Sequence, residues 1–181
     1  AGAAAEGFEI DFTEGDAERL PYPDGAFDAV LSCVWVMFTP DQERAAAELL
    51  RVCRPGGTVA LDAWTPDGFI GRLLTLLPRP PGQPSPLAWG TAHRVCELLG
   101  PGAVELHLTE RTHVFRHRSA EDFVEFMRAN YGPMIRAFER TDPAERGRLH
   151  AELVSLCERS STGPGMRVPA AYLEVVLRTR G

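Results

Sequence analysis

An alternation of strand, helix and strand in the first third of the chain limits the possible folds more than any other feature. Residues 27–32 form a short, mostly apolar run, which is typical of a strand buried on both faces. A helix signal follows, with Thr39 as the expected N-cap, Pro40 at the first helical position and Gln42 completing a capping box. Residues 58–64 are the next predicted strand. Because the links are short, we expect two parallel neighbouring strands joined by a right-handed crossover.

Further elements are predicted on both sides of this unit. Residues 1–6 are interpreted as the end of a helix that Gly7 terminates, and residues 8–14 alternate between apolar and polar side chains with the period of a strand. Residues 54–57, Arg-Pro-Gly-Gly, are expected to form a tight turn. After these come a helix at 67–77, an extended proline-rich loop at 78–86, a helix from its N-cap Thr91 to Gly100, and a strand at 103–115.

The last third of the chain is predicted to be helical until a closing strand. Ser119 is the expected N-cap of a helix, and two more helical stretches are predicted at 133–139 and 143–159. Residues 163–165, Gly-Pro-Gly, end the last of these, and residues 172–177 form the final strand. We therefore expect a core at 1–118 and 169–181 and a helical lid or insert at 119–168.

Composition excludes several classes of function. The 181 residues carry a net charge of −6 without a basic cluster, which argues against nucleic-acid binding. All 19 basic residues are Arg, so Schiff-base or general-base chemistry through Lys is impossible in this chain. No apolar run is long enough to cross a membrane and no signal peptide is visible, so we expect a cytoplasmic protein. The four cysteines lack the spacing of a zinc or redox motif, and we expect no metal site.

One stretch, Gly15 to Trp64, resembles a known enzyme family. The resemblance rests on two segments, GDAERLPYPDGAFDAVLS and, overlapping the end of the predicted helix, LLRVCRPGGTVALDAW. The stretch resembles class I S-adenosylmethionine-dependent methyltransferases of the ubiquinone/menaquinone-biosynthesis-like branch (methyltransferase type 11). Weaker similarity continues through WGTAHRVCELLG, SAEDFVEFM and YLEVVLRT. The resemblance implies an α/β, Rossmann-like sheet with an antiparallel last strand, a helical lid insert, and S-adenosylmethionine as cofactor.

The resemblance also implies where the cofactor binds. Such enzymes hold it at the carboxyl ends of their parallel strands. Just after the strand at 8–14, the Asp16 carboxylate can accept from the adenine amine and the Ala17 N–H can donate to a ring nitrogen. The alternative for Asp16 is a turn cap. The methionine part is expected against residues that follow the strand at 27–32. The complete set of expected cofactor-binding residues is Asp16, Ala17, Glu18, Ser32, Cys33, Val34 and Met37.

One part of the family pattern is absent from these residues. The family has a first strand with a glycine-rich loop and an acidic residue after the second strand, which binds the ribose. No GxGxG occurs in the chain, and Gly56-Gly57 precedes a strand rather than a helix. We therefore expect an incomplete record of a longer enzyme, lacking the N-terminal strands. A polypeptide beginning at Ala1 is not expected to bind the cofactor normally.

The acceptor is expected to be an apolar or aromatic small molecule. Candidate acceptor contacts are Trp64, Phe69, Trp89 and Tyr131, with core packing as their alternative role. No catalytic base is assigned, because an in-line methyl transfer needs one only if the acceptor must lose a proton. Two other functions stay open, a non-catalytic methyltransferase-like binding or dimerisation module and a nicotinamide-dependent oxidoreductase. The oligomeric state is not determined by these patterns.

Overall fold

The computed structural model describes residues 6–181, which form a mixed α/β structure around one four-stranded sheet. The strands lie in the order β1-β2-β4-β3; β1 and β2 are parallel, and β4 runs antiparallel to both of its neighbours. The predicted fold class, including the antiparallel last strand, is confirmed. The strands are β1 (Phe27–Cys33), β2 (Cys53–Trp64), β3 (Ala103–His117) and β4 (Met166–Thr179).

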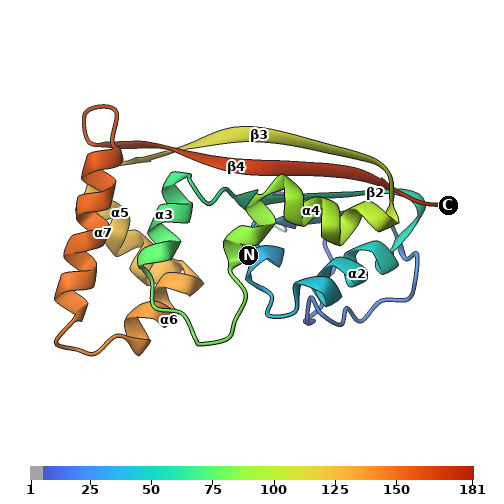
Figure 1. The fold of residues 1–181 in the computed structure, drawn as a ribbon, viewed down its shortest axis with the longest axis horizontal. Helices are drawn as coiled ribbons and strands as arrows, with labels where there is room; N and C mark the ends of the chain where they lie inside the picture. The colour runs from blue at the N-terminus through green and yellow to red at the C-terminus, as the bar shows by residue number, and fades with distance from the viewer. Residues whose placement is uncertain (1–5) are drawn as a thin grey trace.

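Helices lie along one side of the strands in the view of Figure 1, with α2 and α4 under one end and α3, α5, α6 and α7 under the other. None of the helices in the described part of the chain is long and apolar enough to span a membrane. The helices are η1 (Val36–Phe38), α2 (Gln42–Val52), α3 (Phe69–Leu76), η2 (Pro86–Gly90), α4 (Ala92–Leu99), η3 (Gly100–Gly102), α5 (Ala120–Asn130), α6 (Gly132–Arg140) and α7 (Arg146–Ser160).

The strand predicted at residues 8–14 is wrong. The segment is irregular, and Phe8, Ile10 and Phe12 are 62%, 55% and 84% exposed. A strand requires a neighbour for its backbone hydrogen bonds, and no strand of residues 6–181 pairs with this segment. An alternating pattern alone therefore does not produce a strand here. The helix end expected before Gly7 falls almost wholly on residues 1–5, outside the described residues.

The prediction that the strand at 27–32 is buried on both faces is also wrong. This segment, β1, forms an edge of the described sheet and pairs only with β2. Helix α2 packs near one of its faces, and on the other face Leu31 is 77% exposed. An apolar run becomes a doubly buried strand only where other elements cover both of its faces. The parallel pairing of β1 with β2, in contrast, is confirmed.

Helix α2 begins two residues later than predicted. The Asp41 carboxylate accepts a hydrogen bond from the Arg44 N–H at 2.9 Å, so Asp41 is the N-cap. The Thr39 hydroxyl instead donates to the Val36 carbonyl at 2.8 Å and closes η1. Pro40 therefore precedes the helix. The segment 54–57, expected as a separate turn, is part of β2, in which Gly56 adopts a φ of 70°.

Two other predicted N-caps are confirmed. The Thr91 hydroxyl accepts from the Arg94 N–H at the start of α4, and the Ser119 hydroxyl accepts from the Asp122 N–H at the start of α5. Both are short polar side chains that satisfy an amide at a helix start. Local chemistry was sufficient at these positions because neither cap depends on a distant part of the chain.

The buried side of β4 changes along the strand. Its register with β3 is regular from Met166 to Arg178, so a twist rather than a bulge accounts for the change. Helices α2 and α4 lie under one end of the strands and α3, α5 and α7 under the other (Figure 1), and α3 and α7 pack against β4. The buried positions are Met166, Val168 and Ala170 near the start of β4, and Leu173, Val175 and Leu177 near its end.

Candidate functional site

The turn after residue 15 has two groups available for an adenine, one on Asp16 and one on Ala17. The Asp16 Oδ1 accepts from the Glu18 N–H at 2.9 Å and the Asp16 carbonyl accepts from the Arg19 N–H at 2.9 Å, so Asp16 does cap a turn. Within residues 6–181 the Ala17 N–H donates to no protein acceptor. Asp16 is exposed, and its second carboxylate oxygen is not used in this turn. The turn therefore presents a donor and an acceptor on adjacent residues, as adenine binding requires.

Glu18 fastens this turn to helix α2. Its Oε1 accepts from the Asp41 N–H at 2.8 Å, and its carbonyl accepts from the Arg44 Nε at 2.9 Å. Both contacts involve the first turn of α2, where a carboxylate is favoured by the free amides and the helix dipole. The structure thus gives Glu18 a positioning role, and its contact with a cofactor stays a prediction.

The chain turns sharply as it leaves β1. The Ser32 hydroxyl accepts from the Val36 N–H at 3.2 Å and starts η1. Between them, Val34 adopts a φ of 65°. A β-branched residue in this left-handed region is strained, and such strain persists only where the surroundings enforce it, often at binding sites. Met37, in η1, is fully buried. The segment from Ser32 to Met37 therefore forms one continuous connection at the carboxyl end of β1.

The strain at Val34 leads to a testable prediction. Val34→Gly removes a half-buried side chain and gives the unfolded chain more freedom, and both effects lower the stability of the fold. The same change relieves roughly 1–2 kcal/mol of backbone strain, because glycine adopts the left-handed conformation without cost. We expect the free energy of unfolding to stay within about 1 kcal/mol of the parent value. Val30→Gly, an equally half-buried residue of β1 with ordinary backbone, is the matched control and is expected to lose about 2 kcal/mol. Urea unfolding measures both; equal losses would contradict strain at Val34.

Cys33 and Asp62 meet across the β1–β2 pair. They are register partners, and the Cys33 Sγ lies 3.6 Å from the Asp62 Oδ2. Burial and the neighbouring carboxylate raise the pKa of the Cys33 thiol, so it is a neutral thiol rather than a nucleophile at pH 7. The Asp62 Oδ1 is buried and has no hydrogen-bond partner in the described structure. Asp62 was not predicted from the sequence, although a lone carboxylate inside the apolar run TVALDAW was a visible signal.

None of the four predicted acceptor contacts belongs to the lining of the cavity described below. Phe69 and Trp89 are 1% and 0% exposed and belong to the core. Trp64 is half-buried, and its ring contacts those of Phe115 and Tyr172. Tyr131 is half-buried against Phe38, with ring centroids 6.2 Å apart. Their contact with an acceptor stays a prediction.

A cavity of about 400 Å³ opens between η1, the proline-rich loop 78–86 and α6. Its volume is in the range of small-molecule sites. Trp35 and Phe38 form an aromatic wall, and Trp35 is 67% exposed. The buried side chains of Met37 and Leu74 line it as well. Met37, one of the residues expected to bind the cofactor, also lines this cavity. The cavity therefore lies next to the connection that follows β1.

Three arginines that were not predicted from the sequence also line the cavity. Arg136 and Arg140 lie one turn apart on α6, and Arg79 lies on the facing loop. None of them forms an ion pair with a residue between 6 and 181, and no Asp, Glu or His lines the cavity. The signal that could have revealed Arg136 and Arg140 is their spacing of four on a helix.

The groups around the cavity suit binding and orientation rather than proton transfer. Tyr131, next to Phe38, has its hydroxyl buried without a partner in the described residues, and this burial raises the pKa of the phenol. It therefore stays protonated across the physiological range. With neither carboxylate nor imidazole in the lining, the cavity offers apolar contact and positive charge.

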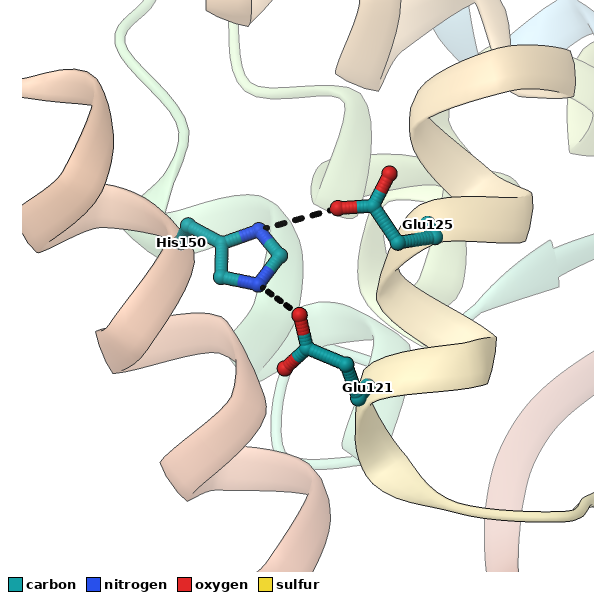
Figure 2. A group of neighbouring side chains, drawn as sticks. All are labelled: Glu121, Glu125 and His150. Carbon is teal, nitrogen blue, oxygen red and sulfur yellow. Dashed lines mark hydrogen bonds and ion pairs between the residues drawn. The ribbon is translucent and has the colours of Figure 1, made fainter.

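A second cluster joins α5 to α7 and is drawn in Figure 2. The His150 Nε2 lies 2.7 Å from the Glu121 Oε1, and its Nδ1 lies 3.6 Å from the Glu125 Oε1. One ligand atom from each of the three residues lies within 4.8 Å of the other two, a spacing that could hold a metal ion. Arg128, however, already donates to Glu125 at 2.9 Å and lies 3.5 Å from the His150 Nδ1. We therefore attribute the cluster to the packing of α5 against α7.

Sequence comparison links the chain to methyltransferases. Residues 1–61 match the family model described as methyltransferase domain. Two uncharacterized proteins of Mycobacterium tuberculosis are similar, one 40% identical over 75% of this chain and 52% of the relative, the other 38% identical over 86% and 60%. The demethylmenaquinone methyltransferase of Thermus thermophilus is 45% identical over 35% of this chain and 29% of its own length. The chain thus spans about half the length of the first curated relatives it matches.

Solved structures share the fold at low identity. The YcgJ protein of Bacillus subtilis matches 99% of this chain and 75% of its own, with a TM-score of 0.61 at 17% identity. A Thermotoga maritima protein described as a SAM-dependent methyltransferase, possible histamine N-methyltransferase, matches 98% and 67%, with a TM-score of 0.52 at 16% identity. The [4+2]-cyclase SpnF matches 99% and 61%, with a TM-score of 0.51 at 22% identity, so the fold by itself does not define the reaction. Residues 1–61 are therefore similar to a methyltransferase domain, part of the chain is similar to a demethylmenaquinone methyltransferase, and the chain shares its fold with a structure described as a SAM-dependent methyltransferase.

Proposed function

We propose that the complete protein transfers a methyl group from S-adenosylmethionine to a small molecule held in the cavity between η1, the loop 78–86 and α6. One observation carries this proposal: Trp35 and Met37, in the connection expected to face the methionine part of the cofactor, also line the cavity. A molecule in the cavity is therefore next to the expected methyl donor. The matched family and fold support a methyltransferase over an oxidoreductase.

The turn at residues 16–18 is proposed to hold the adenine. The unused Asp16 oxygen would accept from the exocyclic amine, the Ala17 N–H would donate to a ring nitrogen, and Glu18 would hold the turn against α2. The small side chain of Ala17 leaves room for the ring to approach the backbone. The ribose-binding segment of the family has no counterpart in these 181 residues, so binding has to be measured with the complete protein.

Helices α5 to α7 are proposed to act as a lid over the acceptor. They are inserted between β3 and β4, and α6 contributes one wall of the cavity. The cluster of His150 with Glu121 and Glu125 ties α5 to α7, so the lid helices would move as a unit (Figure 2). A lid of this kind excludes water and holds the acceptor in line with the methyl donor.

In this reaction the protein would hold the acceptor in the correct orientation toward the methyl donor. S-adenosylmethionine, when bound, supplies an electrophilic methyl group, and the acceptor attacks it directly. The apolar lining around Met37 and Leu74 would keep the site dry, and the aromatic wall would fix the plane of the acceptor. No lining residue is available as a base, so we propose an acceptor atom that is nucleophilic without help from the protein.

Titration with S-adenosylmethionine tests the proposal. In the complete protein, Asp16→Ala should weaken binding by roughly 1–3 kcal/mol, because a hydrogen bond to a charged group is lost. Isothermal titration calorimetry measures the change. Asp67→Ala is the control: Asp67 is a second exposed carboxylate, it accepts no hydrogen bond within the described residues, and the variant should bind like the parent.

Two results would contradict this assignment. Failure of the folded parent protein to bind S-adenosylmethionine would refute the proposed function. Unchanged affinity in Asp16→Ala would remove Asp16 from the adenine site. Asp16→Asn separates the two roles of the residue, since an amide oxygen can still accept from the Glu18 N–H while the charge is lost.

A further inference from the structure

We propose that the methyl acceptor is a flat, apolar molecule that carries an acidic group, and that Arg136 and Arg140 bind this group. The inference rests on the proposed function and names the class of its substrate. Its basis is the arrangement of charge around the cavity. Arg136 and Arg140 come from α6 and Arg79 comes from the facing loop, so positive charge borders the cavity from two sides.

The three arginines gather where no carboxylate of the cavity lining balances their charge. The protein has a net charge of −6, and eight of its arginines form ion pairs with carboxylates in the described structure. Around the cavity, by contrast, three cations gather without any carboxylate in the lining. Like charges four residues apart on a helix are unfavourable by roughly 0.2–0.5 kcal/mol, so helix stability does not explain Arg136 and Arg140. An anionic ligand would compensate this charge.

The remainder of the lining defines the other half of the ligand. Trp35 and Phe38 present aromatic surface, and their rings meet edge to face at 6.4 Å. A tryptophan that is 67% exposed beside a cavity is typical of a binding surface. Leu74 and Met37 add buried apolar contact. A planar ring system fits between these groups, and its acid would lie toward the arginines.

Guanidinium geometry favours an acid with two or more oxygens. Arginine donates two parallel hydrogen bonds to a carboxylate or phosphate, and it remains charged at every physiological pH. A carboxylate and a phosphate share this chemistry, and the structure does not favour one of them. Binding is expected to weaken as salt is added, because the arginines are exposed to solvent.

Calorimetry with three related probes tests the inference. The complete protein is titrated with 2-naphthoate, 2-naphthyl phosphate and the neutral 2-naphthamide, with and without S-adenosylhomocysteine. At least one anion should bind about tenfold or more tightly than the amide, as expected for a charge-assisted hydrogen bond. The anion that binds more tightly identifies the acid class.

Two variants assign the effect to the arginines. The double variant Arg136→Gln/Arg140→Gln should lose the preference for the anions, about tenfold or more, and keep its affinity for 2-naphthamide. Arg72→Gln, an exposed arginine of α3 outside the lining and without an ion pair in residues 6–181, is the matched control and should behave like the parent. Thermal midpoints show that both variants are folded.

Failure of this inference is distinguishable from failure of the proposed function. Equal affinity for anions and amide, or an unchanged preference in the double variant, overturns the acidic acceptor even if S-adenosylmethionine binds. If the parent protein does not bind S-adenosylmethionine, the methyltransferase function is refuted. The affinities of the three probes would then still show whether the cavity prefers anions. Naphthoate binding that persists in the double variant would place the anion elsewhere.

Discussion

Gly90→Ala is expected to destabilise the protein by about 3 kcal/mol or more. A methyl group at this position would lie 2.0 Å from the Trp64 carbonyl oxygen and 2.9 Å from the Thr65 Cα. Both are backbone atoms, so no side-chain rotation can make room, and η2 would have to separate from the end of β2. Gly90 immediately precedes Thr91, the N-cap of α4, so the displacement would also disturb the start of that helix.

Urea unfolding measures the loss as a lower transition midpoint. For a small protein a loss of this size corresponds to a shift of about 1–3 M urea. Gly132→Ala is the control, because a methyl group there meets nothing within 4 Å, and Gly132 begins α6, where Ala is well tolerated. We expect its stability to change by less than about 1 kcal/mol. A parent-like midpoint for Gly90→Ala would contradict the close contact between η2 and β2.

Phe123→Ala should cost about 3–5 kcal/mol, the usual range for removing a fully buried phenylalanine. Phe123 is 0% exposed, and its ring meets those of Phe69, Phe115 and His117 with centroids 5.8, 5.3 and 5.1 Å away. It therefore joins α5 to both α3 and β3. The cavity left behind should also loosen α5 to α7, which hydrogen exchange would detect as faster exchange in these helices than in α2.

Phe126→Ala on the same helix is the control for this change. Phe126 is 52% exposed, and within residues 6–181 the one aromatic ring that it meets is that of His117, at 5.4 Å. We expect a loss below about 1 kcal/mol, because little buried area disappears. If both variants lost the same stability, α5 would not pack as the structure shows, and the proposed lid would need a different anchor.

Part of the fold was predictable because its signals are local. Thr91 and Ser119 cap their helices as expected, and the link from β1 through α2 to β2 produces the parallel pair. Caps and short crossovers depend on neighbouring residues and on chain handedness, both visible in the sequence. The strand expected at 8–14 failed for the opposite reason, since its alternation could not supply a neighbouring strand.

The candidate site was less predictable. The resemblance to methyltransferases led to Asp16 and Ala17, and the structure shows that Asp16 also caps a turn. Trp89 was expected near an acceptor, yet it is completely buried. Arg136 and Arg140, which line the cavity, received no role from the sequence because an exposed arginine on a helix is ordinary until its surroundings are known.

The sequence by itself determined the parallel strand pair and most of the helices, which follow from periodicities and short links that act over a few residues. The antiparallel closing strand was implied by the family resemblance, which the motifs and their spacing carry. Only the tertiary structure decided that β1 forms an edge of the described sheet, that the buried side of β4 changes along its length, and that Arg79 faces α6 across a cavity. Burial and charge clustering depend on which distant segments meet, because a side chain is covered or paired only by neighbours in space.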